Sequence, residues 1–144
     1  MNISFKLDRD EEIDPNDPLG DIRIRHNQTL LSVQSTYLDS WFDVLIDGYK
    51  SLKNQKKIAL EIIEEPEVII FEPISRGFRI KYGTKELLFD DLNEFYQSLL
   101  TSTQDFLYQL EQESENLSEL PIIIKIRHFV EQSTIKQQQN SIYC

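Results

Sequence analysis

Apolar residues recur every three or four positions between residues 92 and 110, and this is the strongest periodic signal in the chain. The spacing predicts an amphipathic helix of about five turns with a single apolar face. That face consists of Leu92, Phe95, Tyr96, Leu99, Leu100, Thr103, Phe106, Leu107 and Leu110. Such a helix needs another layer against which to bury its apolar face, so the preceding segments must supply that layer.

The first part of the chain predicts three short strands. Apolar and polar residues alternate in residues 3–7, 22–25 and 31–34, which is typical of strands with one buried face. The acidic, proline-containing segment 8–20 predicts a loop after the first strand. Asn27 and Gln28 suit a turn, so we expect the second and third strands to form a hairpin.

A further amphipathic helix is predicted for residues 37–53, and its apolar face includes Trp41. A hydroxyl of Ser35 or Thr36 is expected to cap the first free amides of this helix. Gly48 costs about 1 kcal/mol relative to alanine inside a helix, so we expect a close packing contact or a weak point there. We expect Trp41 in the core, whereas an exposed tryptophan would be an anchor for a partner.

Residues 58–89 predict four more strands. Apolar runs occur at residues 58–62, 68–71, 78–82 and 86–89, and prolines or glycines separate most of them. Because the connections are short, these strands are expected to form an antiparallel meander.

The segment 121–132 fits two patterns. Five apolar positions fit one face of a helix, whereas three or four positions, including Ile122, Ile124 and Ile126, fit a strand. We favour the helix because more positions agree with it. Residues 133–144 are rich in glutamine and predict a polar tail that frays.

These segments predict the α+β class, in the order β-β-β-α-β-β-β-β-α-α. We expect an antiparallel sheet of about six or seven strands, with two or three helices packed on one face. A chain of 144 residues suits a single domain, here residues 1–132, followed by the tail 133–144.

The charge balance limits the kinds of partner. The chain has 25 acidic residues against 15 Lys and Arg, which gives a formal net charge of −10. Nucleic acids and anionic membranes are polyanions that such a surface repels, so neither is expected as a partner, whereas a basic protein fits. The first eight residues do not resemble a secretory signal and the apolar runs are short, so we expect a cytoplasmic location.

Several kinds of chemistry find no support in the sequence. The only histidines are His26 and His128, and the lone cysteine, Cys144, is the last residue, so neither a metal site nor a cofactor is expected. The four glycines are never clustered, which argues against a phosphate-binding loop. Both histidines are interpreted as surface residues, and the chain is expected not to be an enzyme.

Carboxylates form the most informative pattern. Asp39, Asp43 and Asp47 are spaced four residues apart and therefore lie along one line of the helix. Glu64, Glu65 and Glu67, with Glu61 before them, flank Pro66 at a turn between strands. One interpretation is a solvated helix face and an acidic turn. The functional hypothesis is a docking surface for a basic partner, and a pair of acids for glycoside chemistry is the least favoured alternative.

Basic residues are fewer and fall on predicted strands. They could line the outer face of the sheet and pair across strands with glutamates. The residues concerned are Arg23, Arg25, Arg76, Arg79 and Lys81.

Three segments together carry a family resemblance. Residues 35–41 open an amphipathic helix, Glu64, Glu65 and Pro66 lead into an apolar strand that ends at Phe71, and residues 90–95 open the long helix. Over roughly residues 21–110, this arrangement resembles the small acidic α+β immunity proteins of bacterial polymorphic-toxin and contact-dependent inhibition systems. The resemblance implies a protein that binds and blocks a cognate toxin, often a basic nuclease, through an acidic surface.

The leading hypothesis is therefore a non-enzymatic binding protein that neutralises a basic toxin by occlusion. Its expected contact residues are Asp39, Asp43, Asp47, Glu64, Glu65 and Glu67. An alternative is an adaptor subunit that forms homo-oligomers through a sheet edge or the last helix, burying Ile122, Ile123 and Phe129 between copies. A third possibility is an enzyme with a pocket that holds a histidine beside a carboxylate. The sequence leaves the oligomeric state open.

Overall fold

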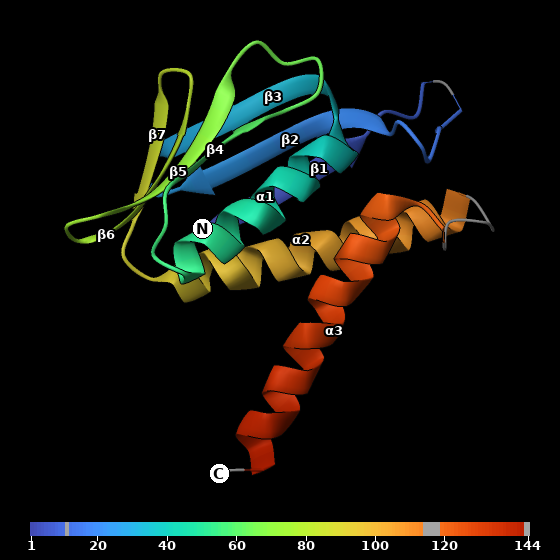
Figure 1. Cartoon of the computed structure of the whole chain (residues 1–144). Coiled ribbons are helices and arrows are strands. Elements are labelled where there is room, and N and C mark those ends of the chain that lie inside the picture. The colour runs from blue at the N-terminus through green and yellow to red at the C-terminus, as the bar shows by residue number, and fades with distance from the viewer. Residues whose placement is uncertain (11, 114–118, 143–144) are drawn as a thin grey trace.

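The computed structural model describes the backbone of residues 1–10, 12–113 and 119–142, and side chains within these ranges as far as residue 132. The chain belongs to the α+β class, and its strands and helices follow one another in the expected order (Figure 1). The segment 121–132 is helical, as favoured from its apolar spacing.

The first three strands form an antiparallel sheet in the order β1-β2-β3. They are β1 (Asn2–Leu7), β2 (Leu19–His26) and β3 (Thr29–Tyr37). His26 pairs with Thr29, and Asn27 takes a positive φ of 54° between them, which confirms the predicted hairpin. The alternation turns Ile22 and Ile24 inward, where both are fully buried.

The other four strands form a second antiparallel sheet, in the order β4-β5-β6-β7. They are β4 (Ile58–Glu61), β5 (Val68–Ile74), β6 (Gly77–Tyr82) and β7 (Lys85–Phe89). This is the predicted meander. The structure nevertheless divides the seven strands into two sheets where we expected one, because β7 lies close to β2 and β3 without a ladder of hydrogen bonds to them in the described part of the chain.

Helix α1 (Leu38–Lys53) connects the two sheets and lies at the centre of the molecule. Ten of its 16 residues are buried, including Trp41, which is fully buried as expected. The predicted cap is wrong: the residue before the helix is Tyr37, with no capping hydrogen bond from its side chain. The hydroxyl of Thr36 instead accepts a hydrogen bond from Trp41 Nε1 at 2.8 Å, because a buried indole N–H requires a partner.

Gly48 of α1 provides the close packing contact that its position suggests. The ring of Phe71, on β5, lies so near that a Cβ atom on residue 48 would be 2.4 Å from it. The missing side chain therefore lets α1 approach the second sheet closely, which outweighs the low helix propensity of glycine.

Helix α2 (Leu92–Glu113) runs along the first sheet beside β1 and also contacts α1. Its first turn is capped by Asp91, whose Oδ1 accepts the N–H of Asn93 at 2.9 Å. Its apolar residues recur every three or four positions, which places Phe95, Leu99 and Phe106 in the core, where they are fully buried.

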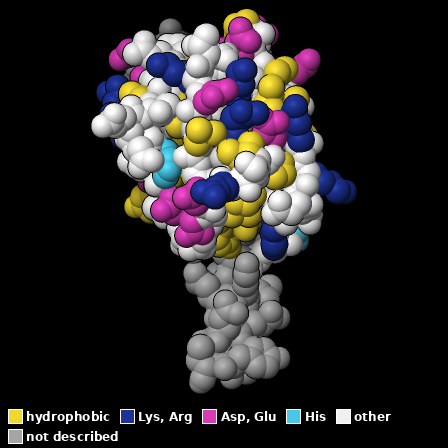
Figure 2. Space-filling model, turned by 90° about the vertical axis from the view of Figure 1, so that its left-hand side faces the viewer, with side chains coloured by type: hydrophobic (Ala, Val, Ile, Leu, Met, Phe, Trp, Pro, Cys, Tyr) yellow, Lys and Arg dark blue, Asp and Glu magenta, His cyan; other side chains and the backbone are white. Residues whose placement is uncertain are grey.

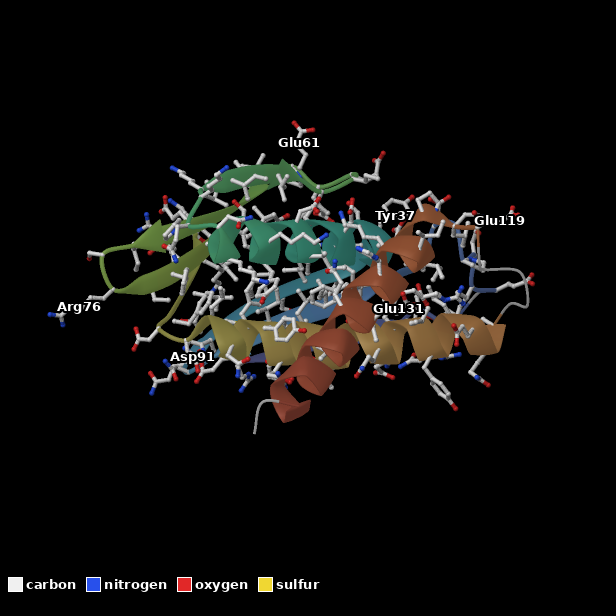
Figure 3. The ribbon with its side chains drawn as sticks, turned by 60° about the horizontal axis from the view of Figure 1, so that its bottom comes forward. Tyr37, Glu61, Arg76, Asp91, Glu119 and Glu131 are labelled. Carbon is white, nitrogen blue, oxygen red and sulfur yellow. The ribbon has the colours of Figure 1, made fainter. Side chains whose placement is uncertain are left out.

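Helix α3 (Pro121–Ile142) crosses over α1 and α2 and then extends away from the rest of the molecule (Figures 1 and 3). On its inner side, α3 buries Ile123, Ile126 and Phe129 against the rest of the fold. These side chains therefore belong to the core of a single copy. Helical backbone thus continues into the segment that we predicted as a polar tail. Among the described residues, no helix combines the length and the apolar character needed to cross a membrane.

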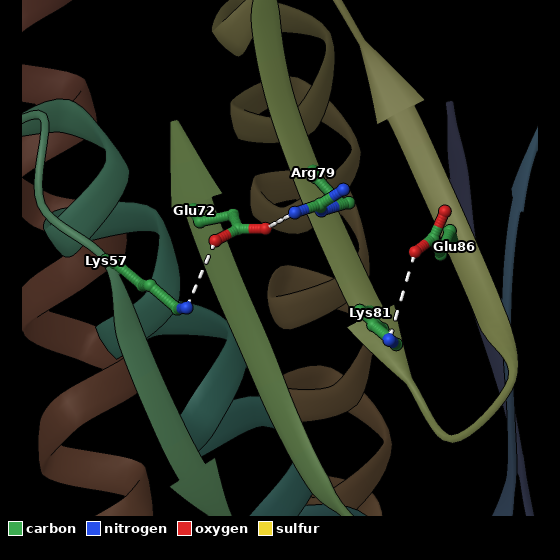
Figure 4. Close-up of polar contacts among 5 residues, drawn as sticks. All are labelled: Lys57, Glu72, Arg79, Lys81 and Glu86. Atoms are coloured by element: carbon green, nitrogen blue, oxygen red, sulfur yellow. Dashed lines mark hydrogen bonds and ion pairs between the residues drawn. The ribbon is translucent and has the colours of Figure 1, made fainter. Parts of the chain in front are cut away.

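The outer face of the second sheet carries charged pairs across its strands. Glu72 on β5 accepts a hydrogen bond from Arg79 on β6 and pairs with Lys57 at 3.3 Å, while Lys81 and Glu86 are 4.0 Å apart (Figure 4). Arg79 and Lys81, two of the five basic residues named in the sequence analysis, therefore pair with glutamates across strands, as expected. Seen from the side on which β6 and β7 lie, Lys and Arg side chains are interspersed with hydrophobic ones (Figure 2).

Candidate binding surface

The predicted line of aspartates is the part of α1 that the fold leaves open. Asp39, Asp43 and Asp47 are partly exposed, whereas their neighbours at positions 41, 42, 44, 45 and 46 are buried. The helical repeat of 3.6 residues keeps positions four apart on one side, which explains the line. All three carboxylates therefore reach the surface on one stripe.

Lys125 of α3 occupies part of this stripe. Its Nζ donates hydrogen bonds to Asp43 and, at 2.7 Å, to Oδ1 of Asp47. Partial burial on its own lowers the pKa of Lys125, but the hydrogen bonds to the two carboxylates outweigh it and raise the pKa above its ordinary value. Two of the three aspartates therefore already share an internal cation, which fastens α3 to α1.

Asp39 lacks such a partner. Its Oδ1 is shielded from solvent and accepts no hydrogen bond from any residue that the structure describes. Desolvation raises the pKa of this carboxyl, the nearby charges of Asp17 and Asp43 raise it further, and the backbone amides of Ser40 and Asp39 itself act in the opposite direction. The charged form of Asp39 is thus less stable than that of an ordinary surface aspartate, and a cation beside it would relieve that cost.

A hollow of about 340 Å³ opens beside Asp39. Asp39, Asp43 and Lys125 form its polar side, while Ile63 of the β4–β5 loop and Ile122 of α3 contribute apolar surface. It is completed by Pro15, Asn16, Ser40, Leu120 and Pro121. Carboxylate and aliphatic groups side by side suit a long basic side chain, whose apolar stem and charged end differ in the same way.

The second predicted group lies on the β4–β5 loop. Glu64, Glu65 and Glu67 line a shallow hollow there, together with Glu61. Figure 3 shows Glu61 pointing away from the helices. Glu64 has a φ of +64°, a left-handed conformation that costs a residue with a Cβ about 1–2 kcal/mol. The loop therefore presents three carboxylates, beside Glu61 at the end of β4, on a backbone that is strained at one position.

Two contacts hold this loop against the rest of the fold. The N–H of Ile63 donates to Ser40 Oγ on α1 at 3.0 Å, and the Tyr82 hydroxyl donates to Glu65 at 3.4 Å. Desolvation, followed by the charges of Glu65 and Glu67, raises the pKa of Tyr82 to about 12, so this hydroxyl stays a donor at neutral pH. The loop and the start of α1 are thus direct neighbours, joined through Ile63 and Ser40.

The structure separates the six predicted residues into three environments. Asp39 lies at a hollow with no partner in the described ranges, Asp43 and Asp47 form hydrogen bonds with Lys125, and the three glutamates lie on the adjacent loop. Sequence reasoning missed Lys125 and Ile63. Lys125 had a usable signal, because it lies within a helical pattern of Ile122, Ile126 and Phe129, where a charged residue needs a partner.

The histidines lie away from these carboxylates, and only His128 is as exposed as expected. The side chain of His26 is only 13% exposed: its Nδ1 is 3.9 Å from Glu94, and its ring contacts the edge of Phe89. His128 is exposed and lies 3.0 Å from Gln132. Neither histidine lines the two acidic hollows, and within the described ranges no His, Cys, Asp and Glu side chains cluster as metal ligands would.

Comparison of the chain with protein-family models, curated proteins and solved structures finds no match.

Proposed function

We propose that the chain is a non-enzymatic binding protein for a basic protein partner, and that it acts in the cytoplasm as an immunity protein that blocks a basic bacterial toxin. The observation that carries the proposal is Asp39, whose shielded carboxylate oxygen has no hydrogen-bond partner among the described residues and lies at the edge of an open hollow. The toxin role comes from the resemblance of residues 21–110 to immunity proteins.

In this proposal an arginine or lysine of the partner enters the hollow and pairs with Asp39. Its aliphatic stem covers Ile63 and Ile122, and its charge offsets the desolvation that disfavours the charged form of Asp39. A charged hydrogen bond formed out of contact with water is stronger than one on an open surface. This single insertion would give the complex its most specific contact.

The loop glutamates serve the approach of the partner. Glu64, Glu65 and Glu67 are adjacent to the hollow through Ile63, and the net charge of −10 attracts a basic surface over a distance. Such steering raises the association rate at low salt and fades as the Debye length shortens. Occlusion follows once the partner's basic surface is covered.

Asp43 and Asp47 have a different part in this proposal. Because Lys125 already neutralises one of their two charges, they contribute less to the attraction than the sequence pattern suggests. Their main effect is to hold α3 in place, and α3 supplies Ile122 and Leu120 to the hollow.

The proposal is tested by capture from native cells at low salt, with the wild-type protein, Asp39→Asn and the triple variant Glu64→Gln, Glu65→Gln, Glu67→Gln as baits. We expect the wild type to capture a basic protein that Asp39→Asn binds at least about tenfold more weakly, while the triple variant mainly slows association. Asp90→Asn, which changes an exposed carboxylate between β7 and α2, is a matched control.

Two results contradict the proposal. One is a captured partner whose affinity is the same for the wild type and Asp39→Asn at about 0.05 M and about 0.3 M salt. The other is a captured partner that is acidic. The immunity role requires in addition that the partner be toxic when expressed alone and harmless when this chain is present.

A further inference from the structure

A second kind of hollow lies near the other end of α1, where α1, α2 and α3 meet. Its volume is about 260 Å³, and none of the described residues that line it is acidic, although acidic residues outnumber basic ones in the chain. The lining residues are Tyr49, Lys50, Lys53, Tyr96, Phe129 and Gln132. This composition suits an anion, in contrast to the acidic hollow beside Asp39.

Three aromatic rings, one from each helix, form the apolar walls. Tyr49 stacks on Tyr96 with ring centres 5.0 Å apart, and Phe129 meets Tyr96 edge-on at 5.7 Å and Tyr49 edge-on at 6.1 Å. Rings fixed in this way give a rigid surface that favours another planar group. Hollows between packed helices are common places for small ligands.

Tyr49 contributes a polar group to this apolar surface. Tyr49 is only 8% exposed. Its hydroxyl forms no hydrogen bond with any residue in the described part of the chain, but the oxygen retains some contact with solvent. The hydroxyl is therefore not fully shielded from solvent, and Tyr49 is one of the residues that line the hollow. Desolvation and then the nearby Tyr96 raise the pKa of Tyr49, so its hydroxyl remains a hydrogen-bond donor at neutral pH.

Two lysines provide positive charge at the rim. Lys50 and Lys53 are exposed in the last turn of α1, and neither forms an ion pair with a residue that the structure describes. Lys57, Lys81 and Lys125, by contrast, each have a carboxylate within 4.0 Å. The ammonium groups beside the hollow are thus available to an external anion.

We propose that this hollow binds a small aromatic carboxylate. The ring of the ligand lies against Tyr96 and Phe129, the Tyr49 hydroxyl donates to its carboxylate, and Lys50 and Lys53 neutralise that charge. The volume is below the range of about 300–1,000 Å³ that holds drug-sized molecules, so the ligand has one ring. This inference uses residues that the proposed function does not, and it stands if that proposal fails.

Titration of the full chain with benzoate, followed by calorimetry and by ligand-observed NMR, tests the proposal. We expect saturable binding with a Kd of about 1 mM, as suits a ligand of this size. Tyr49→Phe keeps the stacked ring and removes only the hydroxyl, so we expect it to weaken binding about fivefold. The double variant Lys50→Gln, Lys53→Gln should weaken binding at least about tenfold.

Matched controls distinguish binding in this hollow from nonspecific attraction of an anion to surface lysines. Lys85→Gln removes an exposed lysine of β7 and should leave benzoate binding unchanged. Benzyl alcohol, acetate and inorganic phosphate, which lack the charge or the ring, should each bind at least about tenfold more weakly than benzoate. The inference is overturned if benzoate shows no saturable binding, or if any of these three probes binds as tightly as benzoate. It is also overturned if the double variant Lys50→Gln, Lys53→Gln lowers the Tm but leaves the affinity for benzoate unchanged.

Discussion

Replacing Lys125 by methionine removes the cation that fastens α3 to α1 while keeping most of its aliphatic stem. The ammonium, in a side chain that is 26% exposed, bonds to Asp43 and Asp47, whose side chains are 49% and 40% exposed. Pairs as open as these contribute about 0.2–1 kcal/mol each, and the uncompensated repulsion between aspartates four residues apart adds a few tenths. We expect Lys125→Met to lower the free energy of unfolding by about 1–2 kcal/mol.

For a chain of this length, that loss corresponds to a decrease in Tm of about 3–7 °C. Thermal and urea unfolding of the wild type and the variant measure it, with Lys56→Met, an exposed lysine, as the control. Because the pKa of Lys125 is raised in the folded state, its stabilisation is fully present below its ordinary pKa of 10.5 and is lost as the pH rises through the raised value. At neutral pH and above, the difference in stability between wild type and variant should therefore narrow only under strongly alkaline conditions.

A double-mutant cycle with Asp47→Asn isolates the pairing itself. The two substitutions should be less than additive, because either one alone breaks the Lys125–Asp47 contact. Strict additivity, or a Lys125→Met variant as stable as the wild type at neutral pH, would refute the claim that this contact holds α3 in place.

Three other substitutions test the packing and the strained loop. Gly48→Ala should destabilise the protein by about 1–3 kcal/mol despite its better helix propensity, since its Cβ would meet the buried Phe71 ring, and Phe71→Leu should recover part of the loss in chemical denaturation. Thr36→Val leaves the buried Trp41 N–H without an acceptor, so its melting curve should show a loss of about 1–3 kcal/mol, which is largely absent when Trp41→Phe is already present. Glu64→Gly should be about 0.5–1 kcal/mol more stable than Glu64→Ala, because only glycine adopts the positive φ freely; equal urea midpoints would contradict this.

The sequence was sufficient for the local parts of the fold. Alternation and helical spacing depend on neighbouring residues, so they located the strands, the helices and hairpins such as the one at Asn27. Burial of Trp41 followed from the same spacing. The division into two sheets was not predictable, because it depends on how tertiary packing places β7 beside β2 and β3 and not on any single segment.

The candidate site shows the same limit more clearly. The line of aspartates followed directly from their spacing, but Lys125 meets Asp43 from 82 positions away in the sequence. Whether a surface carboxylate is free or paired depends on such distant contacts, which composition and periodicity do not reveal. The capping error at Thr36 has a similar cause, since a tertiary contact with Trp41 took the hydroxyl that a local rule had assigned to the backbone.

Amide chemical-shift mapping with a short arginine-containing peptide tests most directly whether the open carboxylates form one binding surface. We predict that the shifts at low salt concentrate on residues 39–43 and 62–67, and that Asp39→Asn removes most of them. Shifts of equal size at exposed acidic residues elsewhere, such as Asp91 and Glu111, or a pattern unchanged in Asp39→Asn, would contradict it.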